Sequence, residues 1–164
     1  MNKTSRSLNI SKGERRIRQL LGSKYDFQRF EKPTRTAREA AIAIGCNEAQ
    51  IGKSIIFRSV SDKPVLVVAS GVNKVDQKKV GLIIGQKVKQ AEPKFVREKS
   101  GYALGGVPPI GHLSTPITLL DQDLLIFERI WVAAGSAYSV VSVTPNELRL
   151  LTKAEFFDIC RSSR

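Results

Sequence analysis

The sequence predicts an α+β protein, in which a mixed β-sheet is flanked by helices. Helix-capping signals alternate with β-rich stretches along the chain, and no segment repeats another. The stretch Val65-Leu-Val-Val-Ala69 is apolar at every position, which is typical of a strand buried on both faces of a sheet. A chain of 164 residues buries roughly 70% of the surface that its unfolded form exposes, so we expect a substantial hydrophobic core.

The first helix is predicted from a capping box, in which a serine and a glutamate three residues later satisfy free backbone groups of the first turn. Ser11 and Glu14 have this spacing, and the helix is expected to end near Gly22. The apolar stripe on this helix consists of Ile17, Leu20 and Leu21.

A strand and a second helix follow. Tyr25 to Glu31 alternates enough to predict a strand. Thr36 and Glu39 form another capping box at the start of an alanine-rich helix from Ala37 to Ile44, and Gly45 is the residue that ends it.

The middle of the chain predicts a hairpin and a third helix. Ile51 to Arg58 and Val65 to Ala69 are expected to pair, with Ser61 to Pro64 as the turn between them. Asp76 caps a helix that runs to Ile84 and stops at Gly85. The residues of this helix predicted to face inward are Val80, Ile83 and Ile84.

The rest of the chain contributes further short elements. Pro93 suits the first position of a helix that runs to Lys99, and Thr144-Pro-Asn-Glu147 combines a capping box with proline at that same position. A last helix is predicted from Lys153 to Cys160. The β-rich stretches are Val88 to Ala91, Pro116 to Leu120, Ile130 to Ala134 and Ser139 to Val143.

The charge of the chain is high and uneven. Its 27 Lys and Arg against 15 Asp and Glu give a net charge of +12, and residues 1–38 alone carry eleven basic and three acidic residues. Such a field favours polyanions, because neutralised phosphates release their counterions. We therefore expect a basic arm with a short helix over residues 1–22 and a single domain over residues 23–164; a merely solvated basic face is the alternative.

Composition also argues against several classes of protein. Cys46 and Cys160 lie far apart without metal or disulfide spacing, and with one histidine no metal pattern is present, so no metal or cofactor is expected. No run of about 18 apolar residues and no signal peptide are found, and the first helix lacks aromatic anchors for a membrane. The chain is expected to be a cytoplasmic protein without a membrane partner.

The segment Gly101-Tyr-Ala-Leu-Gly-Gly-Val-Pro-Pro-Ile-Gly-His112 contains four of the twelve glycines and two of the seven prolines. Glycine lets a ligand approach the backbone closely, and proline stiffens the chain. The N–H groups of this loop are therefore candidates to contact a ligand.

Triad-type hydrolysis and nucleoside triphosphate hydrolysis both lack the residues they need. Serine and cysteine hydrolases of the triad type need a histidine base, and His112 has no Gly-x-Ser-x-Gly elbow to accompany it; a turn-capping or solvent-facing role for His112 is the favoured alternative. Gly52-Lys53-Ser54 has the end of a phosphate-binding loop, but the preceding glycine is too distant and the chain continues as a strand. Lys53 either extends along the strand edge towards water or points into a cleft.

The order and content of these motifs resemble the YbaK/prolyl-tRNA-synthetase-associated family (YbaK/EbsC) of aminoacyl-tRNA deacylases. The likeness runs from about Tyr25 to Cys160 and comprises Lys53 in Ile-Gly-Lys-Ser, the glycine–proline loop, Asp121 and Ala133-Ala-Gly135. It implies a curved, barrel-like mixed sheet with a cleft at one side. It also implies aminoacyl-tRNA as a partner, with an aminoacyl-tRNA synthetase as a further candidate.

The resemblance implies roles for individual residues. Lys53 would be an electrostatic clamp on the terminal nucleotide and the ester, and Gly105 and Gly106 would form an oxyanion cradle. The ester of an aminoacyl-tRNA is labile, so orienting water can supply much of the rate without a protein nucleophile. The remaining residues expected to bind substrate are Gly101, Pro109, Gly111, Asp121, Gly135 and Ser136. Asp121 is expected to brace the loop, and ordinary turn chemistry is the favoured alternative for Ser136.

The sequence departs from the cysteine-clearing members of that family. Their serine and aspartate align with Ala133 and Val140, and their basic turn is replaced by Gly135-Ser-Ala-Tyr138. These changes suggest a pocket for another amino acid. Trp131 and Tyr138 are candidates to stack on a terminal adenine, with ordinary packing in the sheet as the alternative.

Three hypotheses follow. The leading hypothesis is a trans-editing hydrolase that deacylates mischarged aminoacyl-tRNA. The second is a catalytically silent tRNA-binding or synthetase-associated module of the same fold. The third is a binding domain for small ligands that resemble an aminoacyl-adenylate.

Overall fold

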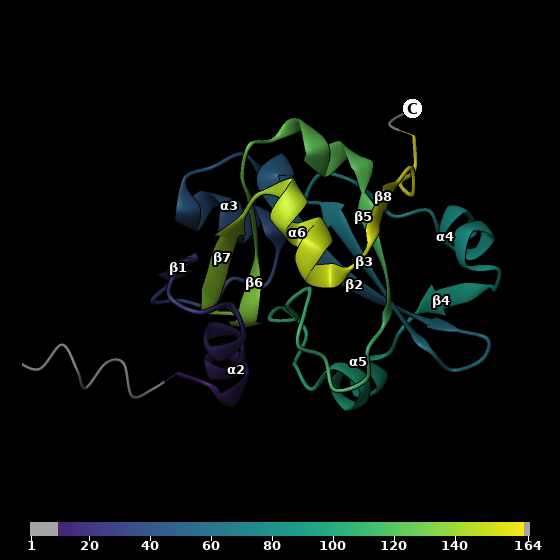
Figure 1. Ribbon diagram of the computed structural model, residues 1–164, viewed down its shortest axis with the longest axis horizontal. Coiled ribbons are helices and arrows are strands. Elements are labelled where there is room, and N and C mark those ends of the chain that lie inside the picture. The colour runs from purple at the N-terminus through teal and green to yellow at the C-terminus, as the bar shows by residue number, and fades with distance from the viewer. Residues whose placement is uncertain (1–9, 163–164) are drawn as a thin grey trace, which may run out of the picture.

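The computed structural model of the chain describes residues 10–162 (Figure 1). The helices are α2 (Lys12–Leu21), α3 (Ala37–Ile44), η2 (Glu48–Gln50), α4 (Gln77–Ile84), α5 (Pro93–Ser100), η3 (Gln122–Ile126) and α6 (Pro145–Thr152). The strands are β1 (Asp26–Arg29), β2 (Ile51–Ser59), β3 (Pro64–Ser70), β4 (Val88–Gln90), β5 (Ile117–Asp121), β6 (Ile130–Ser136), β7 (Ser139–Val143) and β8 (Glu155–Phe157).

All eight strands belong to one mixed sheet, in the order β1-β7-β6-β2-β3-β5-β8, with β4 paired to β2 beside this path. The pairs β2–β6, β3–β5 and β5–β8 are parallel, and the other pairs are antiparallel. Figure 1 shows α6 in front of the sheet, α3 behind it, and α2 and α4 at its two ends. The predicted fold class, a mixed sheet flanked by helices, is confirmed.

The core lies on both faces of β3, as its unbroken apolar run predicts. Val65 to Ala69 have no exposed surface. Leu66 and Val68 contribute to the main cluster of buried side chains, while Val65, Val67 and Ala69 contribute to the cluster under α4. Side chains of a strand alternate between faces, so a strand buried on both sides must be apolar throughout.

The capping residues predicted from sequence begin their helices. The hydroxyl oxygen of Ser11 accepts a hydrogen bond from the backbone N–H of Glu14 at 3.1 Å, and Thr36 and Asp76 cap α3 and α4 in the same way. At Thr144 the capping box is complete in both directions. Local capping chemistry therefore sets where these helices begin.

Some predictions about the helices were wrong. Residues 153–160 do not form a helix, because Lys153 ends α6 in the left-handed conformation and the following residues pair with β5 as strand β8. Leu20 and Ile83 were expected to face inward, but 55% and 38% of their surfaces are exposed.

The helix α2 packs into the main core. Ile17 and Leu21 are buried there beside residues of β6 and β7. Gly13 lies so close to Gly135 that a Cβ added at Gly135 would come within 2.3 Å of the Gly13 carbonyl oxygen. Within the described residues, no helix has both the length and the apolar composition needed to cross a bilayer.

Candidate functional site

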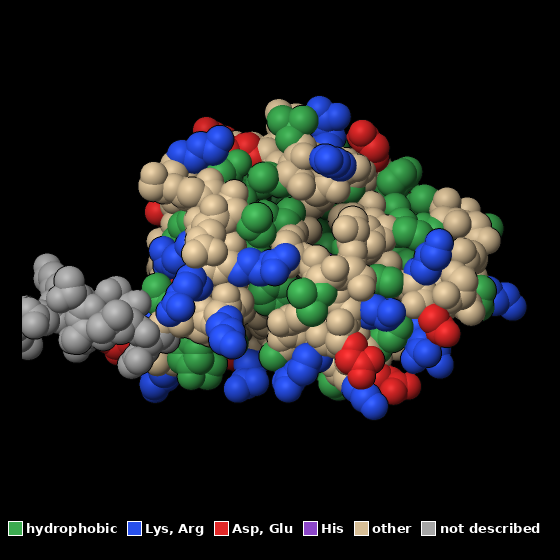
Figure 2. Space-filling model, turned by 60° about the horizontal axis from the view of Figure 1, so that its bottom comes forward, with side chains coloured by type: hydrophobic (Ala, Val, Ile, Leu, Met, Phe, Trp, Pro, Cys, Tyr) green, Lys and Arg blue, Asp and Glu red, His purple; other side chains and the backbone are tan. Residues whose placement is uncertain are grey.

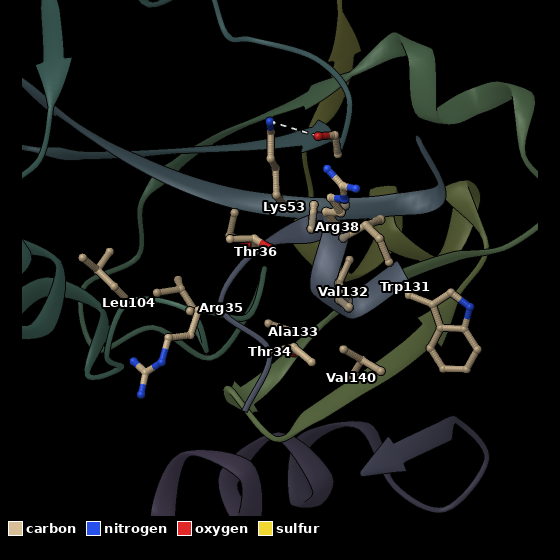
Figure 3. A pocket seen from close by; sticks show the side chains of 18 of the residues that line it. Thr34, Arg35, Thr36, Arg38, Lys53, Leu104, Trp131, Val132, Ala133 and Val140 are labelled. Atoms are coloured by element: carbon tan, nitrogen blue, oxygen red, sulfur yellow. Dashed lines mark hydrogen bonds between the residues drawn. The ribbon is translucent and has the colours of Figure 1, made fainter. Parts of the chain in front are cut away.

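A cavity of about 460 Å³ opens on the sheet face that α3 covers (Figure 3). Four parts of the chain form its walls: the segment that leads into α3, the start of β2, the glycine–proline loop, and the paired strands β6 and β7. The residues whose side chains or backbone define these walls include Thr34, Arg35, Thr36, Arg38, Glu48, Lys53, Ser54, Gly71, Leu104, Gly105, Trp131, Val132, Ala133, Ser136, Ser139 and Val140.

Lys53 lines this cavity from β2. Its ammonium group donates a hydrogen bond to the carbonyl oxygen of Gly71 at 3.3 Å, and Figure 3 shows the side chain extended across one end of the pocket. Burial lowers the pKa of Lys53 below its ordinary value, although the carboxylates of Glu48 and Asp121 partly oppose this shift. The pocket therefore contains a half-buried cation that one carbonyl group holds in place.

Asp121 fixes the end of β3, the strand that leads to Gly71, whose carbonyl oxygen accepts from Lys53. This buried carboxylate accepts hydrogen bonds from the Ser70 N–H and the Asn73 side chain, both at 2.9 Å, and from the Cys160 thiol at 3.3 Å. Burial, together with this carboxylate, raises the pKa of Cys160 to about 12, so the thiol keeps its proton. Asp121 thus lies on the Lys53 side, where it positions the strand that leads to Gly71, and none of its side-chain hydrogen bonds within residues 10–162 goes to the glycine–proline loop.

The loop forms the opposite side of the pocket through Gly105. This residue has a φ of +89°, which favours glycine, and its N–H group has no hydrogen-bond acceptor among residues 10–162. Gly106 does not line the cavity: its N–H donates to the Ala103 carbonyl at 3.1 Å, and an added Cβ would meet Ser136 at 2.6 Å. Gly105 offers a backbone donor, while Gly106 lets the loop pack on β6.

Other predicted loop residues shape the loop without reaching the cavity. Gly101 ends α5 in the left-handed conformation, and Pro109 is buried. The Gly111 carbonyl accepts from the Tyr102 hydroxyl at 3.0 Å, and Nε2 of His112 lies 2.7 Å from the Pro108 carbonyl. Burial lowers the pKa of His112. These contacts close the loop on itself and occupy one nitrogen of the histidine ring.

Ser136 and Gly135 lie where β6 turns towards β7. Ser136 lines the cavity, and its hydroxyl donates to Glu14 at 3.0 Å. Glu14 is fully buried and also accepts from Nε of Arg29 at 2.8 Å and from Nε of Arg18 at 3.4 Å. From the sequence, Glu14 was predicted only as part of a helix cap. Its spacing of three and seven residues from Ile17 and Leu21 is the signal that places it on the buried face of α2.

Ala133 and Val140 face each other across β6 and β7. They are register partners, both line the cavity, and Figure 3 shows them side by side. The hydroxyl groups of Ser54 and Ser139 are buried nearby without a hydrogen-bond partner within residues 10–162. The wall is apolar at its centre, and these two buried hydroxyl groups have no partner within residues 10–162.

The segment before α3 contributes pocket residues that the sequence analysis missed. Thr34, Arg35, Thr36 and Arg38 line the cavity, and Figure 3 shows Arg35 on the Leu104 side, away from Lys53. The basic residues in this segment were the available signal, but they were counted only towards the charge of residues 1–38, and Thr36 was predicted only as a helix cap. Trp131 also lines the wall.

The lining residues limit the chemistry of the site. They include no histidine or cysteine, and Glu48 is their one carboxylate. In the described part of the chain, no three acidic, histidine or cysteine residues gather as a metal site would require. The arrangement can bind an anionic or ester-bearing ligand through Lys53, the arginines and a backbone N–H.

Comparisons with known proteins agree on a family. A model described as "Aminoacyl-tRNA editing domain" matches residues 31–151. The uncharacterised protein YwhH of Bacillus subtilis is 35% identical over 137 residues, which cover 83% of this chain and 87% of YwhH. EbsC of Enterococcus faecalis, named as a candidate Cys-tRNA(Pro)/Cys-tRNA(Cys) deacylase, is 27% identical over 125 residues, 76% of each chain. A crystal structure described as a candidate trans-editing enzyme for prolyl-tRNA synthetase has 35% identity and a TM-score of 0.87, covering 94% of this chain and all of that one.

Proposed function

Because this chain belongs to the family of aminoacyl-tRNA editing domains, we propose that it hydrolyses the ester bond of mischarged aminoacyl-tRNA in trans. The proposal is supported by one observation: Lys53 and Gly105 line the same cavity, and the described residues that line it include no histidine or cysteine. An enzyme that positions water and stabilises charge needs these groups and no covalent intermediate.

In this mechanism Lys53 is a clamp. Its ammonium group attracts the phosphate and ribose end of the substrate and holds the ester beside the loop. The fixed hydrogen bond to Gly71 keeps the amine in one position, so little reorganisation is needed when substrate binds. Arg35 and Arg38 add positive charge to the same cavity.

Gly105 is the oxyanion donor in this mechanism, and Gly106 supports it. The water oxygen attacks the ester carbonyl carbon, and negative charge develops on the carbonyl oxygen near the Gly105 N–H. The bond to the ribose oxygen then breaks, and that oxygen takes up a proton, which leaves free amino acid and tRNA. One such donor is worth about 100-fold to 1000-fold in rate in other enzymes.

The amino acid would lie against Ala133 and Val140. A pair of apolar side chains offers no hydrogen bond to a thiol or hydroxyl, and a buried polar group without a partner costs about 1–3 kcal/mol. We therefore expect the substrate to carry an amino acid other than the cysteine for which EbsC is named.

The same apolar pair also favours a second candidate function. Without polar groups at Ala133 and Val140, the domain could bind tRNA, alone or with a synthetase, and leave the ester intact. Both functions predict tRNA binding, and only the first predicts release of amino acid.

The experiment is incubation of the protein with a panel of tRNAs, each charged with a different amino acid, with release of the labelled amino acid followed over time. We expect turnover of one or a few mischarged species. Intact binding to every tRNA without any release would reject the hydrolase and leave the silent module. Absence of both binding and release would reject both candidates.

A further inference from the structure

We propose that the exposed face of α2 that carries Lys12, Arg15 and Arg16 is the docking surface for the phosphate backbone of the RNA. This inference rests on the proposed function, because it assigns a contact surface to the same substrate. It adds the place where RNA lies outside the pocket.

The three cations share one face of the helix. Residues spaced three and four apart are neighbours on a helix, and Lys12, Arg15 and Arg16 have this spacing. All three are exposed, whereas Ile17 and Leu21 on the opposite face are buried in the core. Within the described residues, none of the three cations takes part in an ion pair.

The one acidic residue of α2 does not neutralise this face. Glu14 is fully buried, and its carboxylate is occupied by Arg29, Arg18 and Ser136. Its negative charge therefore lies on the buried face of α2, where these partners balance it. The outward field of α2 stays positive.

The helix that carries the basic face begins beside a residue of the pocket wall. The N-terminal turn of α2 contacts β6, because Gly13 packs on Gly135 and Glu14 binds Ser136, which lines the cavity. Further along the helix, an added Cβ at Gly111 of the loop would lie within 2.8 Å of Leu20. A ten-residue helix is about 15 Å long, so RNA whose end enters the cavity would have several phosphates within reach of α2.

The chemistry of this face favours a polyanion over a membrane. Figure 2 views the molecule from the end where α2 and α5 lie, and Lys and Arg side chains spread over this face. On α5, by contrast, Lys94 lies 4.0 Å from Glu98, so part of its charge is compensated. A membrane-binding helix inserts its apolar face into the lipid, but the apolar face of α2 is already buried in the protein.

The test compares two triple variants that remove the same charge from opposite ends of the molecule. The first is K12Q/R15Q/R16Q on α2. The control is K78Q/K87Q/K89Q, whose lysines are exposed on and beside α4 and β4, at the other end of the sheet in Figure 1. Affinity for an acceptor-stem RNA that carries no amino acid is measured by fluorescence anisotropy across a series of salt concentrations. Because this RNA has no ester bond, the result does not depend on hydrolysis.

We expect the α2 variant to bind the RNA at least about tenfold more weakly at 0.1 M salt. The slope of log affinity against log salt concentration should become shallower by roughly 2–3, the value for three lost phosphate contacts. The control should lose less than about threefold. Equal losses in both variants, or no loss in the α2 variant, would overturn the proposal. Wild-type binding to phosphatidylserine vesicles without binding to the RNA would overturn it as well.

Circular dichroism and thermal unfolding would confirm that both variants are folded. If the triple α2 variant does not fold, R15Q alone still tests the proposal, because one lost contact should reduce the salt dependence by about 1. A protein that fails to deacylate any tRNA but loses RNA affinity in the α2 variant would contradict the proposed hydrolysis and support this surface. If the protein deacylates tRNA but the α2 variant keeps its RNA affinity, the hydrolysis is supported and the α2 surface is rejected.

Discussion

Two buried carboxylates support the two sides of the pocket, and they differ in the partners they use. Glu14, from α2, holds Ser136 on the loop side and is paired with the guanidinium groups of Arg18 and Arg29. Asp121, from β5, holds the end of β3 on the Lys53 side through a backbone N–H, an amide and a thiol.

The two carboxylates differ in how far their partners are exposed to water. Both arginine partners of Glu14 keep about a third of their side-chain surface exposed, at 34% and 36%, so this network is open to water and salt. The carboxylate of Asp121 accepts from these three groups and from the Asp123 N–H, and all four donors are uncharged and lie within or next to the sheet. The Lys53 side is therefore built into the sheet, whereas the loop side relies on the N-terminal helix.

The largest effect is expected when Glu14 is removed. Glu14→Ala leaves two arginines and the Ser136 hydroxyl without their shared acceptor and should lower the free energy of unfolding by about 3 kcal/mol, the low end for a broken buried pair because the arginines remain partly exposed. Urea denaturation measures the loss. In 1 M salt the loss should be smaller.

The matched control for Glu14 is Glu39→Ala. Glu39 also lies three residues after its cap, but it is exposed, and within residues 10–162 its carboxylate accepts only from the Arg35 N–H, at 3.2 Å. Its removal should cost less than about 1 kcal/mol. Equal losses for the two variants would mean that the Glu14 network contributes no more than an ordinary first-turn glutamate.

A smaller effect is expected at Asp121. Asp121→Asn replaces one acceptor oxygen by an NH₂ group facing other donors, which should cost about 1–2 kcal/mol and show little dependence on salt. Asp123→Asn is the control, because Asp123 is exposed and shares only the Asn73 amide. A salt-dependent loss at Asp121 would remove the distinction between the two carboxylates.

The smallest effect is expected at His112, in the loop. Burial lowers the pKa of His112 in the folded protein, so the unfolded chain takes up its proton at a higher pH. Stability from this group is present at neutral pH and is lost as the pH falls below about 6.5. His112→Gln keeps a donor for the Pro108 carbonyl and should reduce the loss of stability between pH 7.5 and pH 5 by less than about 1 kcal/mol. A variant that loses stability as steeply as the wild type would show that His112 makes no such contribution.

Local signals in the sequence predicted most of the fold. Ser11, Thr36, Asp76 and Thr144 begin their helices as expected, because a cap depends on residues three or four positions apart. The strand at residues 155–157 was missed, because its parallel pairing with β5 joins segments far apart in the chain. A short apolar stretch does not by itself distinguish a helix from a strand.

The site was predictable in part. The motifs that contain Lys53 and Gly105 indicated residues that now line one cavity, as do Ala133 and Val140. The sequence did not indicate which residues of the loop lie outside the cavity. Four of them serve the turning and packing of the loop: Gly101, Gly106, Pro109 and Gly111. The roles of Glu14 and Asp121 also depend on contacts with residues 122 and 51 positions away.

The most direct test of the account is single-turnover deacylation by the wild type, Lys53→Ala and Lys53→Arg, with a mischarged tRNA that the wild type hydrolyses. The account predicts a rate at least about 100-fold lower for Lys53→Ala and partial rescue by Lys53→Arg, with the unfolding free energy nearly unchanged and RNA affinity reduced by no more than one lost phosphate contact. An undiminished rate for folded Lys53→Ala would contradict the account.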